Sequence, residues 1–251
     1  MMPANAPTLF IRNAYLSYDG VVLFHDFNLT LPANKLTCIL GPSGVGKTTL
    51  LRLIAGLITS NSGSTEVFSG EIGGNKNIVY MAQQDCLLPW LTALDNALLG
   101  PKLRGEKLEF PRQQAKALLA QVGLASAENK YPRQLSLGMR QRVALVRTLL
   151  EDKPVVLMDE PFSALDAITR FQLQTLAAEL LKNRTVLLVT HDPVEALRLA
   201  DDIYILSGQP ATLHLAVGLT TPAPRDPAAP EFIQYQATLF HELTEAKGKT
   251  V

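Results

Sequence analysis

The length of 251 residues and the hydrophobic content of 47% suit one large α/β domain with a sizeable buried core. The 23 basic and 23 acidic residues balance, so no field of the whole chain favours nucleic acid or an anionic membrane surface. No apolar stretch reaches the roughly 18–20 residues of a membrane-spanning helix, and the N-terminus lacks the basic and apolar regions of a signal peptide. We therefore expect a soluble cytoplasmic protein that reaches a membrane only through a partner.

The first motif along the chain is glycine-rich and fits the phosphate-binding template G-x-x-x-x-G-K-[ST]. Backbone N–H groups of such a loop can surround a phosphate only where no Cβ intrudes, while Lys47 neutralises phosphate oxygens and the Thr48 hydroxyl can ligate Mg²⁺. The candidate phosphate-binding residues are Gly41, Pro42, Ser43, Gly44, Val45, Gly46, Lys47, Thr48 and Thr49.

The flanks of this loop support the match. Residues 36–40 read as a short buried strand, and leucine or isoleucine at 50, 53, 54 and 57 follows the spacing of a helix. The helix N-terminus would point at the phosphates, where its dipole favours anions. A chance glycine turn in an unrelated loop is the alternative, and this pattern disfavours it. The chain is predicted to bind ATP or GTP.

The pattern changes between about residues 86 and 150. Residues 112–122 and 139–150 read as helices, with little strand signal between them. We interpret residues 86–150 as a helical subdomain inserted into a nucleotide-binding core formed by residues 1–85 and 151–217.

Two further apolar runs end in polar residues. The run at 155–158 leads into Asp159 and Glu160, and the run at 185–189 leads, after one threonine, to His191. Continuous apolar runs of this length are typical of buried parallel strands. Ligands of open α/β sheets bind beyond the carboxyl ends of the strands, so these residues and the glycine-rich loop should face one crevice.

The last part of the chain is predicted to be mostly helical. Asp192, Pro193 and Glu195 have the positions of a helix start, as N-cap, first and third residues. Residues 221–230 are rich in proline, and residues 232–243 carry apolar side chains near helical spacing. We interpret residues 218–251 as a connector followed by a terminal helix that packs on the body.

The segment at 134–142 reads QLSLGMRQR and resembles the L-S-G-G-Q/M signature of ABC ATPases. This signature distinguishes the family from other P-loop proteins, and the match covers roughly residues 8–210. Further matches follow in the family's order: Tyr18 before the loop, Gln83 after a core strand, Asp159-Glu160, residues 163–166 and His191. The resemblance implies an α/β P-loop ATPase core with a mostly parallel sheet, an N-terminal antiparallel β portion and an inserted helical subdomain.

Two segments narrow the resemblance within the family. Residues 87–96, LLPWLTALDN, and residues 162–166, FSALD, are similar to those of ATPase subunits from bacterial importers. The importers concerned take up nitrate, taurine, aliphatic sulfonates and pyrimidine precursors. The expected function is therefore ATP hydrolysis that energises uptake of a small solute through a separate permease.

The resemblance implies roles for the residues around the phosphates. Tyr18 would stack on adenine; a lone tyrosine is more often a surface or core residue, and its position before the glycine-rich loop is what favours stacking. Asp159 would hold Mg²⁺ through its water shell, together with Thr48, and Glu160 would polarise the attacking water. Capping of the next helix is the alternative for the two carboxylates, and Pro161 and the glycine-rich loop disfavour it.

Gln83 and His191 complete the implied catalytic set. The Gln83 amide can both donate and accept, which suits a sensor near Mg²⁺ and the water. Its neighbour Gln84 leaves the register open by one residue. His191 would hydrogen-bond the γ-phosphate and order the water, although a lone histidine after a strand is usually structural.

In the family, the signature segment of one subunit completes the ATP site of another. Ser136 and Gly138 would contact the nucleotide of a second copy, with Asp166 also among the nucleotide-binding residues. The implied assembly is a head-to-tail dimer with ATP between the subunits. It would sit on the cytoplasmic side of the inner membrane against a permease, which would receive its solute from an extracytoplasmic binding protein. Residues 87–90 are candidates for the permease contact, with ordinary core packing as the alternative.

Leu137 is a departure, because the signature usually has glycine there. Its Cβ excludes backbone conformations open to glycine, so we expect a functional but slower site. A stand-alone ABC ATPase acting on DNA or ribosomes is the alternative function, but such proteins usually carry a coiled-coil insert or tandem ATPase units, which 251 residues do not hold. A P-loop kinase or GTPase is disfavoured by the signature-like segment and by the lack of an N-K-x-D motif.

Overall fold

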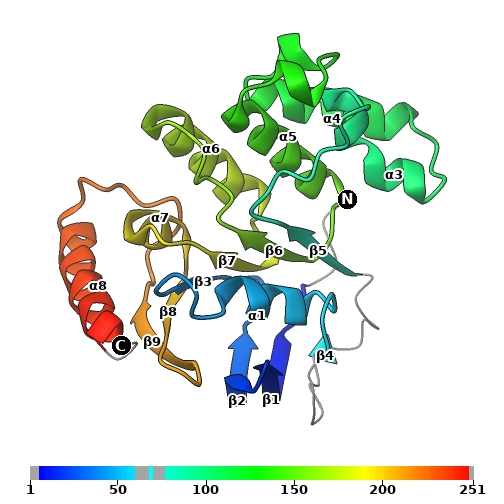
Figure 1. Cartoon of the computed structure of the whole chain (residues 1–251). Coiled ribbons are helices and arrows are strands. Elements are labelled where there is room, and N and C mark those ends of the chain that lie inside the picture. The colour runs from blue at the N-terminus through cyan, green and yellow to red at the C-terminus, as the bar shows by residue number, and fades with distance from the viewer. Residues whose placement is uncertain (1–5, 60–67, 70–76, 249–251) are drawn as a thin grey trace.

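The computed structural model describes residues 6–59, 68–69 and 77–248, whose strands form two sheets (Figure 1). The smaller sheet is antiparallel, in the order β2-β1-β4: β1 (Leu9–Tyr18), β2 (Val21–Leu31) and β4 (Phe68–Ser69). The larger has the order β5-β6-β7-β3-β8-β9: β3 (Leu36–Leu40), β5 (Ile78–Met81), β6 (Val155–Asp159), β7 (Thr185–Val189), β8 (Asp202–Ser207) and β9 (Thr212–Gly218). Within this described sheet only the β8-β9 pair is antiparallel. The predicted fold class is confirmed.

Helices cover both faces of the larger sheet. They are α1 (Lys47–Ile54), α2 (Ala93–Ala97), α3 (Leu99–Leu103), α4 (Glu109–Gln121), α5 (Leu137–Leu150), α6 (Ala167–Leu180), α7 (Pro193–Leu199) and α8 (Pro230–Gly248), with 3-10 turns at Ala125–Ala127 and Pro132–Gln134. In β6, Val155 and Leu157 pack toward α1 and the smaller sheet, whereas Val156 and Met158 pack toward α5, α6 and α7. Burial on both faces explains why this strand reads as an unbroken apolar run.

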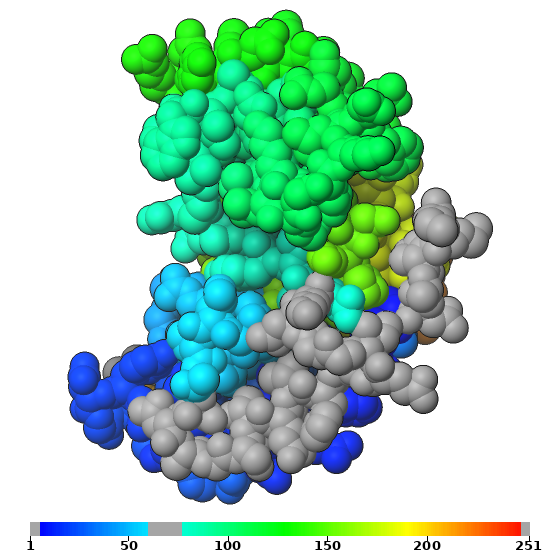
Figure 2. Space-filling model, turned by 90° about the vertical axis from the view of Figure 1, so that its right-hand side faces the viewer, coloured from blue at the N-terminus to red at the C-terminus, as the bar shows by residue number. Residues whose placement is uncertain are grey.

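The inserted helices form a separate lobe. In Figure 2 the cyan-green and green residues of α2 to α5 lie above the blue residues of the smaller sheet. Leucine and valine side chains of α5 face inward, and α5 is also the helix of this lobe that packs against β5. The lobe is therefore joined to the larger sheet on the side of β5 and β6.

The helix after the glycine-rich loop is shorter than predicted. It ends at Ile54, and the Leu57 side chain is 63% exposed. Gly56 adopts φ +69°, its N–H donates to Leu53 O, and the Leu57 N–H donates to Arg52 O at 2.9 Å. These contacts form a Schellman motif, which ends the helix one turn before the apolar spacing does.

The proline-rich connector is held by a buried arginine. The Arg225 guanidinium donates to Leu197 O at 3.0 Å and to Ala200 O at 2.6 Å, and it also bonds Thr221. Burial lowers the pKa of Arg225 below its usual value. The terminal helix α8 then packs on α7, β8 and β9 through Phe232 and other apolar residues. Phe240 is one of the apolar residues at helical spacing within 232–243, but its side chain is half-exposed.

Arg225→Ala should lower the free energy of unfolding by about 2 kcal/mol, because two buried carbonyls lose their donor. Limited proteolysis should also cut residues 221–229 faster. The matched control is Arg133→Ala on an exposed arginine, which should change neither result. Equal stability and equal cleavage of the two variants would contradict the anchoring role of Arg225.

Candidate functional site

The glycine-rich loop joins β3 to α1, and close packing fixes its shape. A Cβ on Gly41 would lie 2.3 Å from Leu206 O, so no side chain fits there. Gly46 has φ +109° and precedes α1 as a cap that offers no side chain to the first N–H groups of the helix. These N–H groups are therefore available to an anion at the helix N-terminus.

A hollow of about 240 Å³ lies against this loop. Its lining residues are Ser43, Gly44, Gly46, Lys47, Thr48, Thr49, Gln83, Asp159 and Glu160. Lys47 Nζ donates to Gly41 O at 2.8 Å and to Pro42 O at 2.9 Å. Desolvation lowers the pKa of Lys47, an effect opposed by the nearby carboxylates of Glu160 and Asp159. An anion that enters the hollow can compete for the protons that Lys47 gives to its own loop.

Asp159 ends β6 at the base of the hollow. Burial raises the pKa of its carboxyl, and a hydrogen bond from Thr48 opposes this effect. The Tyr80 hydroxyl donates to Asp159 Oδ2 at 3.3 Å, and burial next to Asp159 raises the pKa of Tyr80 to about 12. The carboxylate is thus fixed by a hydroxyl on either side, in a position where it can face a cation.

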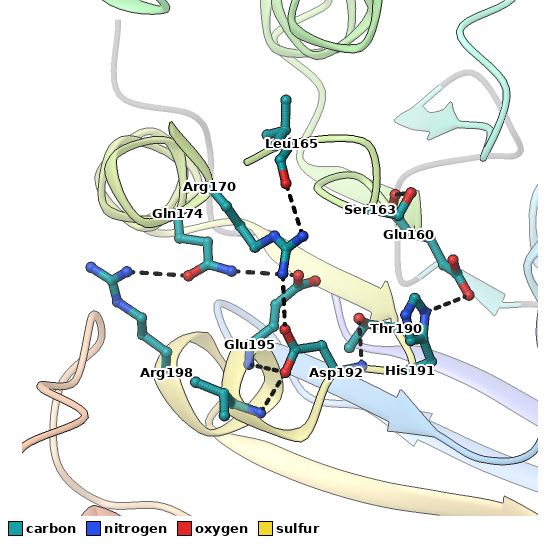
Figure 3. A network of polar contacts seen from close by, with 11 residues as sticks. Glu160, Ser163, Leu165, Arg170, Gln174, Thr190, His191, Asp192, Glu195 and Arg198 are labelled. Atoms are coloured by element: carbon teal, nitrogen blue, oxygen red, sulfur yellow. Dashed lines mark hydrogen bonds and ion pairs between the residues drawn. The ribbon is translucent and has the colours of Figure 1, made fainter. Parts of the chain in front are cut away.

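Glu160 lies one residue further, with the left-handed φ of +48°. Gln83 Nε2 donates to Glu160 Oε2 at 3.4 Å. His191 Nδ1 lies 3.2 Å from Glu160 Oε1 (Figure 3). Gln83 lines the phosphate-loop hollow and also a neighbouring hollow beside Leu137, whereas Gln84 lines only the second of the two. The structure brings Gln83, Glu160 and His191 together at one edge of the larger sheet.

The other predicted site residues lie outside the hollow. Tyr18 is half-exposed at the end of β1, in a hairpin whose turn residues Asp19 and Gly20 both have positive φ. Ser136 caps α5 by accepting from Met139 N, and Asp166 caps α6 by accepting from Thr169 N. That hydrogen bond lowers the pKa of Asp166. None of these three side chains is among the residues that line the hollow.

The signature segment differs from the expectation at Leu137. Leu137 is the first residue of α5, and its side chain is 57% exposed. A helical conformation is open to any L-residue, so the proposed restriction of the backbone by its Cβ does not apply. Gly138 is the tighter position, because a Cβ there would lie 3.2 Å from Ala164 O.

Three residues around the site were not assigned from the sequence. Tyr80 contacts Asp159; Gln141 donates to Glu160 O at 3.0 Å and accepts from Ala164 N at 2.9 Å. Arg170 lies one turn beyond Asp166 and approaches Asp192. Only Gln141 had a sequence signal: it is a polar residue within the predicted helix 139–150, at a position that the structure shows to be buried.

The family model described as ABC transporter matches residues 24–163, which is more than half of the chain. The chain belongs to the ABC transporter family. The chain is therefore an ABC-type ATP hydrolase, and it binds ATP.

Similar proteins of the family include two curated importer subunits. The chain is 46% identical over 213 residues to the aliphatic sulfonates import ATP-binding protein SsuB 1 of Rhodococcus jostii, covering 84% of each chain. It is 42% identical over 211 residues to the taurine import ATP-binding protein TauB of Escherichia coli, covering 80% of each. A solved dimeric structure of the ATP-binding cassette MJ0796, in a post-hydrolysis state bound to ADP and Pi, has 28% identity and a TM-score of 0.73, covering 84% of this chain and 100% of that one.

A buried carboxyl lies behind the site of this ABC protein. Glu195, in the first turn of α7, is 3% exposed, and its Oε2 accepts from Gln174 Nε2 at 3.4 Å (Figure 3). Burial, and next the charge of Asp192, raises the pKa of Glu195 to about 8. The folded state therefore holds a proton that the unfolded chain releases near its ordinary pKa of 4.5.

This pKa difference predicts a pH-dependent stability. The stability that protonated Glu195 contributes is complete below pH 4.5 and is lost as the pH rises through about 8. Glu195→Gln stays neutral, so its free energy of unfolding relative to the natural chain should grow by on the order of 3 kcal/mol between pH 5 and pH 9. Denaturant titrations at both pH values measure this, with the exposed Glu179→Gln as the control. A difference that does not change with pH would contradict the prediction.

Proposed function

We propose that the hollow beside residues 41–49 is the ATP-hydrolysing site that energises a bacterial importer of a small solute. The observation that carries the proposal is the meeting of Lys47, Asp159, Glu160 and His191 beyond the carboxyl ends of three neighbouring strands. The loop N–H groups and Lys47 would bind the β- and γ-phosphates. Tyr18, at the edge of the smaller sheet, would stack on adenine.

The residues of the hollow fit a Mg²⁺ ion that is bound together with phosphates. The described residues contain no group of three or more His, Cys, Asp and Glu side chains that could hold a metal. They do offer the oxygens of Thr48, Asp159 and Gln83 in one hollow. Mg²⁺ is commonly held by one or two protein oxygens, waters and substrate phosphates, so it would enter with ATP. When bound, it would neutralise charge on the phosphates.

Glu160 would polarise the attacking water. Its carboxylate faces the hollow and is oriented from two sides, by Gln83 Nε2 and by His191 Nδ1. The Gln83 amide can orient the same water, and His191 can donate to the γ-phosphate once the imidazole turns from Glu160. A single chain thus presents a water-activating group and one side of the phosphate site.

A second copy of the chain would supply the other side. Ser136 caps α5, Gly138 lies in its first turn and Asp166 caps α6. None of the three lines the hollow of its own chain. The similar ATP-binding cassette MJ0796 forms a dimer. We propose a head-to-tail dimer in which ATP joins the loop of one copy to the signature segment of the other, and in which hydrolysis lets the copies separate.

The loop before α2 is the proposed contact with a permease. Asn96 is fully buried; it accepts from Leu88 N and donates to the carbonyls of Leu88, Leu91 and Thr92, which fixes the loop. This loop presents Trp90 at 69% exposure, and so large an exposed aromatic is typical of an interaction site. Residues 87–90 would receive a helix of the permease.

The proposed location is the cytoplasmic side of the inner membrane. No helix among the described residues is long and apolar enough to cross a bilayer, so transport would need a separate permease. A solute-binding protein would deliver the solute from outside. The names of the relatives support import of an aliphatic sulfonate or taurine. Nitrate or a pyrimidine precursor as the solute rests on the sequence resemblance alone. They give no support to a stand-alone ATPase acting on DNA or ribosomes.

Glu160→Gln should lower ATP turnover by about 100-fold or more while ATP binding is kept, because the amide cannot polarise the water. With ATP the variant should form a dimer that the natural chain forms only transiently. Phosphate release and light scattering after size exclusion measure both. Glu179→Gln is the matched control, and Lys47→Ala should lose ATP binding and the dimer. Full turnover by Glu160→Gln would overturn the assigned chemistry.

The proposed contact with a permease can be tested by a pull-down from native membranes. Tagged Glu160→Gln protein with ATP should retain a multi-spanning membrane protein in mild detergent, identified by mass spectrometry, whereas Trp90→Ala in the same background should not. Recovery of ribosomal or DNA-bound proteins in its place would favour the stand-alone alternative.

A further inference from the structure

Two polar segments meet behind the catalytic edge of the larger sheet. One is the start of α6, which follows the loop of residues 160–166, and the other is the start of α7, which follows His191. Arg170 projects from α6 toward Asp192, as Figure 3 shows. None of these contacts involves the hollow that is lined by the phosphate loop.

Arg170 uses its two terminal nitrogens for different partners. Nη2 donates to Leu165 O at 2.9 Å, and Nη1 lies 3.5 Å from Asp192 Oδ2. The planar guanidinium holds these two donors at a fixed separation, which a lysine ammonium cannot reproduce. Arg170 therefore sets the distance between the loop before α6 and the turn before α7.

Together with the chain itself, these contacts form a closed ring that includes Glu160 and His191. Glu160 begins the loop that ends near Leu165, and Arg170 joins Leu165 O to Asp192. Asp192 directly follows His191, whose Nδ1 returns to Glu160 Oε1 at 3.2 Å. A change in any one link alters the space available to the pair of Glu160 and His191.

Asp192 has two separate uses within the ring. Its Oδ1 accepts from Val194 N at 2.9 Å and from Glu195 N at 3.4 Å, which caps α7. Its Oδ2 faces Arg170. Asparagine is as good an N-cap as aspartate but carries no charge, so Asp192→Asn can keep the cap while weakening the contact with Arg170.

The packing of α6 on α7 has other supports. Arg198 of α7 donates to Phe171 O at 3.0 Å and to Thr175 Oγ1 at 2.7 Å, and its guanidinium lies 3.3 Å from the centroid of the Phe171 ring. Gln174 also bonds both Glu195 and Arg198. The two helices therefore have contacts with each other that do not involve Arg170.

We propose that Arg170 is a positioning residue for hydrolysis: by holding Leu165 O and Asp192 together, it fixes His191 against Glu160. The inference rests on the roles proposed above for Glu160 and His191. Arg170 is not among the residues that line the hollow, so it should affect the rate of the chemical step and leave ATP binding unchanged.

The test compares Arg170→Lys, Asp192→Asn, the double variant and the control Thr175→Val, each in the full chain. The first two should each lower kcat about fivefold with the same KM for ATP. The double variant should lose no more than the more affected single variant, because both changes break one contact. Thr175→Val removes an Arg198 bond between the same helices and should keep kcat near that of the natural chain. Thermal unfolding of all four checks that they are folded.

Three results would overturn the inference. One is a loss of kcat in Thr175→Val equal to that in Arg170→Lys, which would indicate helix packing alone. Another is a rise of KM at constant kcat, and the third is a double variant whose losses multiply. Glu160→Gln separates this failure from that of the proposed function: if it hydrolyses ATP normally, the assigned chemistry is wrong, and if it is inactive while Arg170→Lys is normal, only the role of Arg170 is wrong.

Discussion

The parallel pairing of β6, β7 and β3 is the constraint on which the site depends. In this register Asp159 pairs with Val189, and Val189 pairs with Ile39. The three strands therefore end at one level, and their next residues leave the sheet together toward the same side. Apolar side chains on both faces keep β6 and β7 fully buried in the middle of the sheet. Backbone pairing of the strands thus places the glycine-rich loop, Glu160 and His191 near one another, although they are far apart in the sequence.

The site combines charges that burial alone would neutralise. Desolvation raises the pKa of Asp159 and lowers that of Lys47, so each is pushed toward its uncharged form. The charges of Glu160 and Asp159 oppose this effect on Lys47, whereas the hydroxyls of Thr48 and Tyr80 and the charge of Arg52 stabilise the Asp159 carboxylate. A lone polyanion would meet the repulsion of Asp159 and Glu160, and a lone cation that of Lys47. The arrangement thus suits a polyanion that carries a divalent cation better than either ion alone.

Local chemistry explains which features the sequence could predict. Buried strands, the glycine-rich loop and the cap at Asp192 each depend on neighbours in the chain, so their patterns are visible in the sequence. The early end of α1 depends on Gly56, a local signal that the apolar spacing outweighed in the prediction. The contacts of Gln141 and Arg170 could not be predicted, because they join residues about 20 positions apart across elements whose packing is set by the whole sheet. The resemblance to ABC ATPases, rather than local pattern, selected Gln83 over Gln84.

The backbone at Glu160 shows why its loop has so many supports. A left-handed φ at a residue with a Cβ costs on the order of 1 kcal/mol and persists only where the surroundings determine it. Here the Glu160 N–H donates to Val189 O at 2.8 Å, and its carbonyl accepts from Gln141 Nε2 at 3.0 Å. The same loop is held at its far end by Arg170. One support comes from the sheet, one from the helical lobe and one from α6. The orientation of the Glu160 carboxylate therefore depends on how these three parts are placed relative to one another.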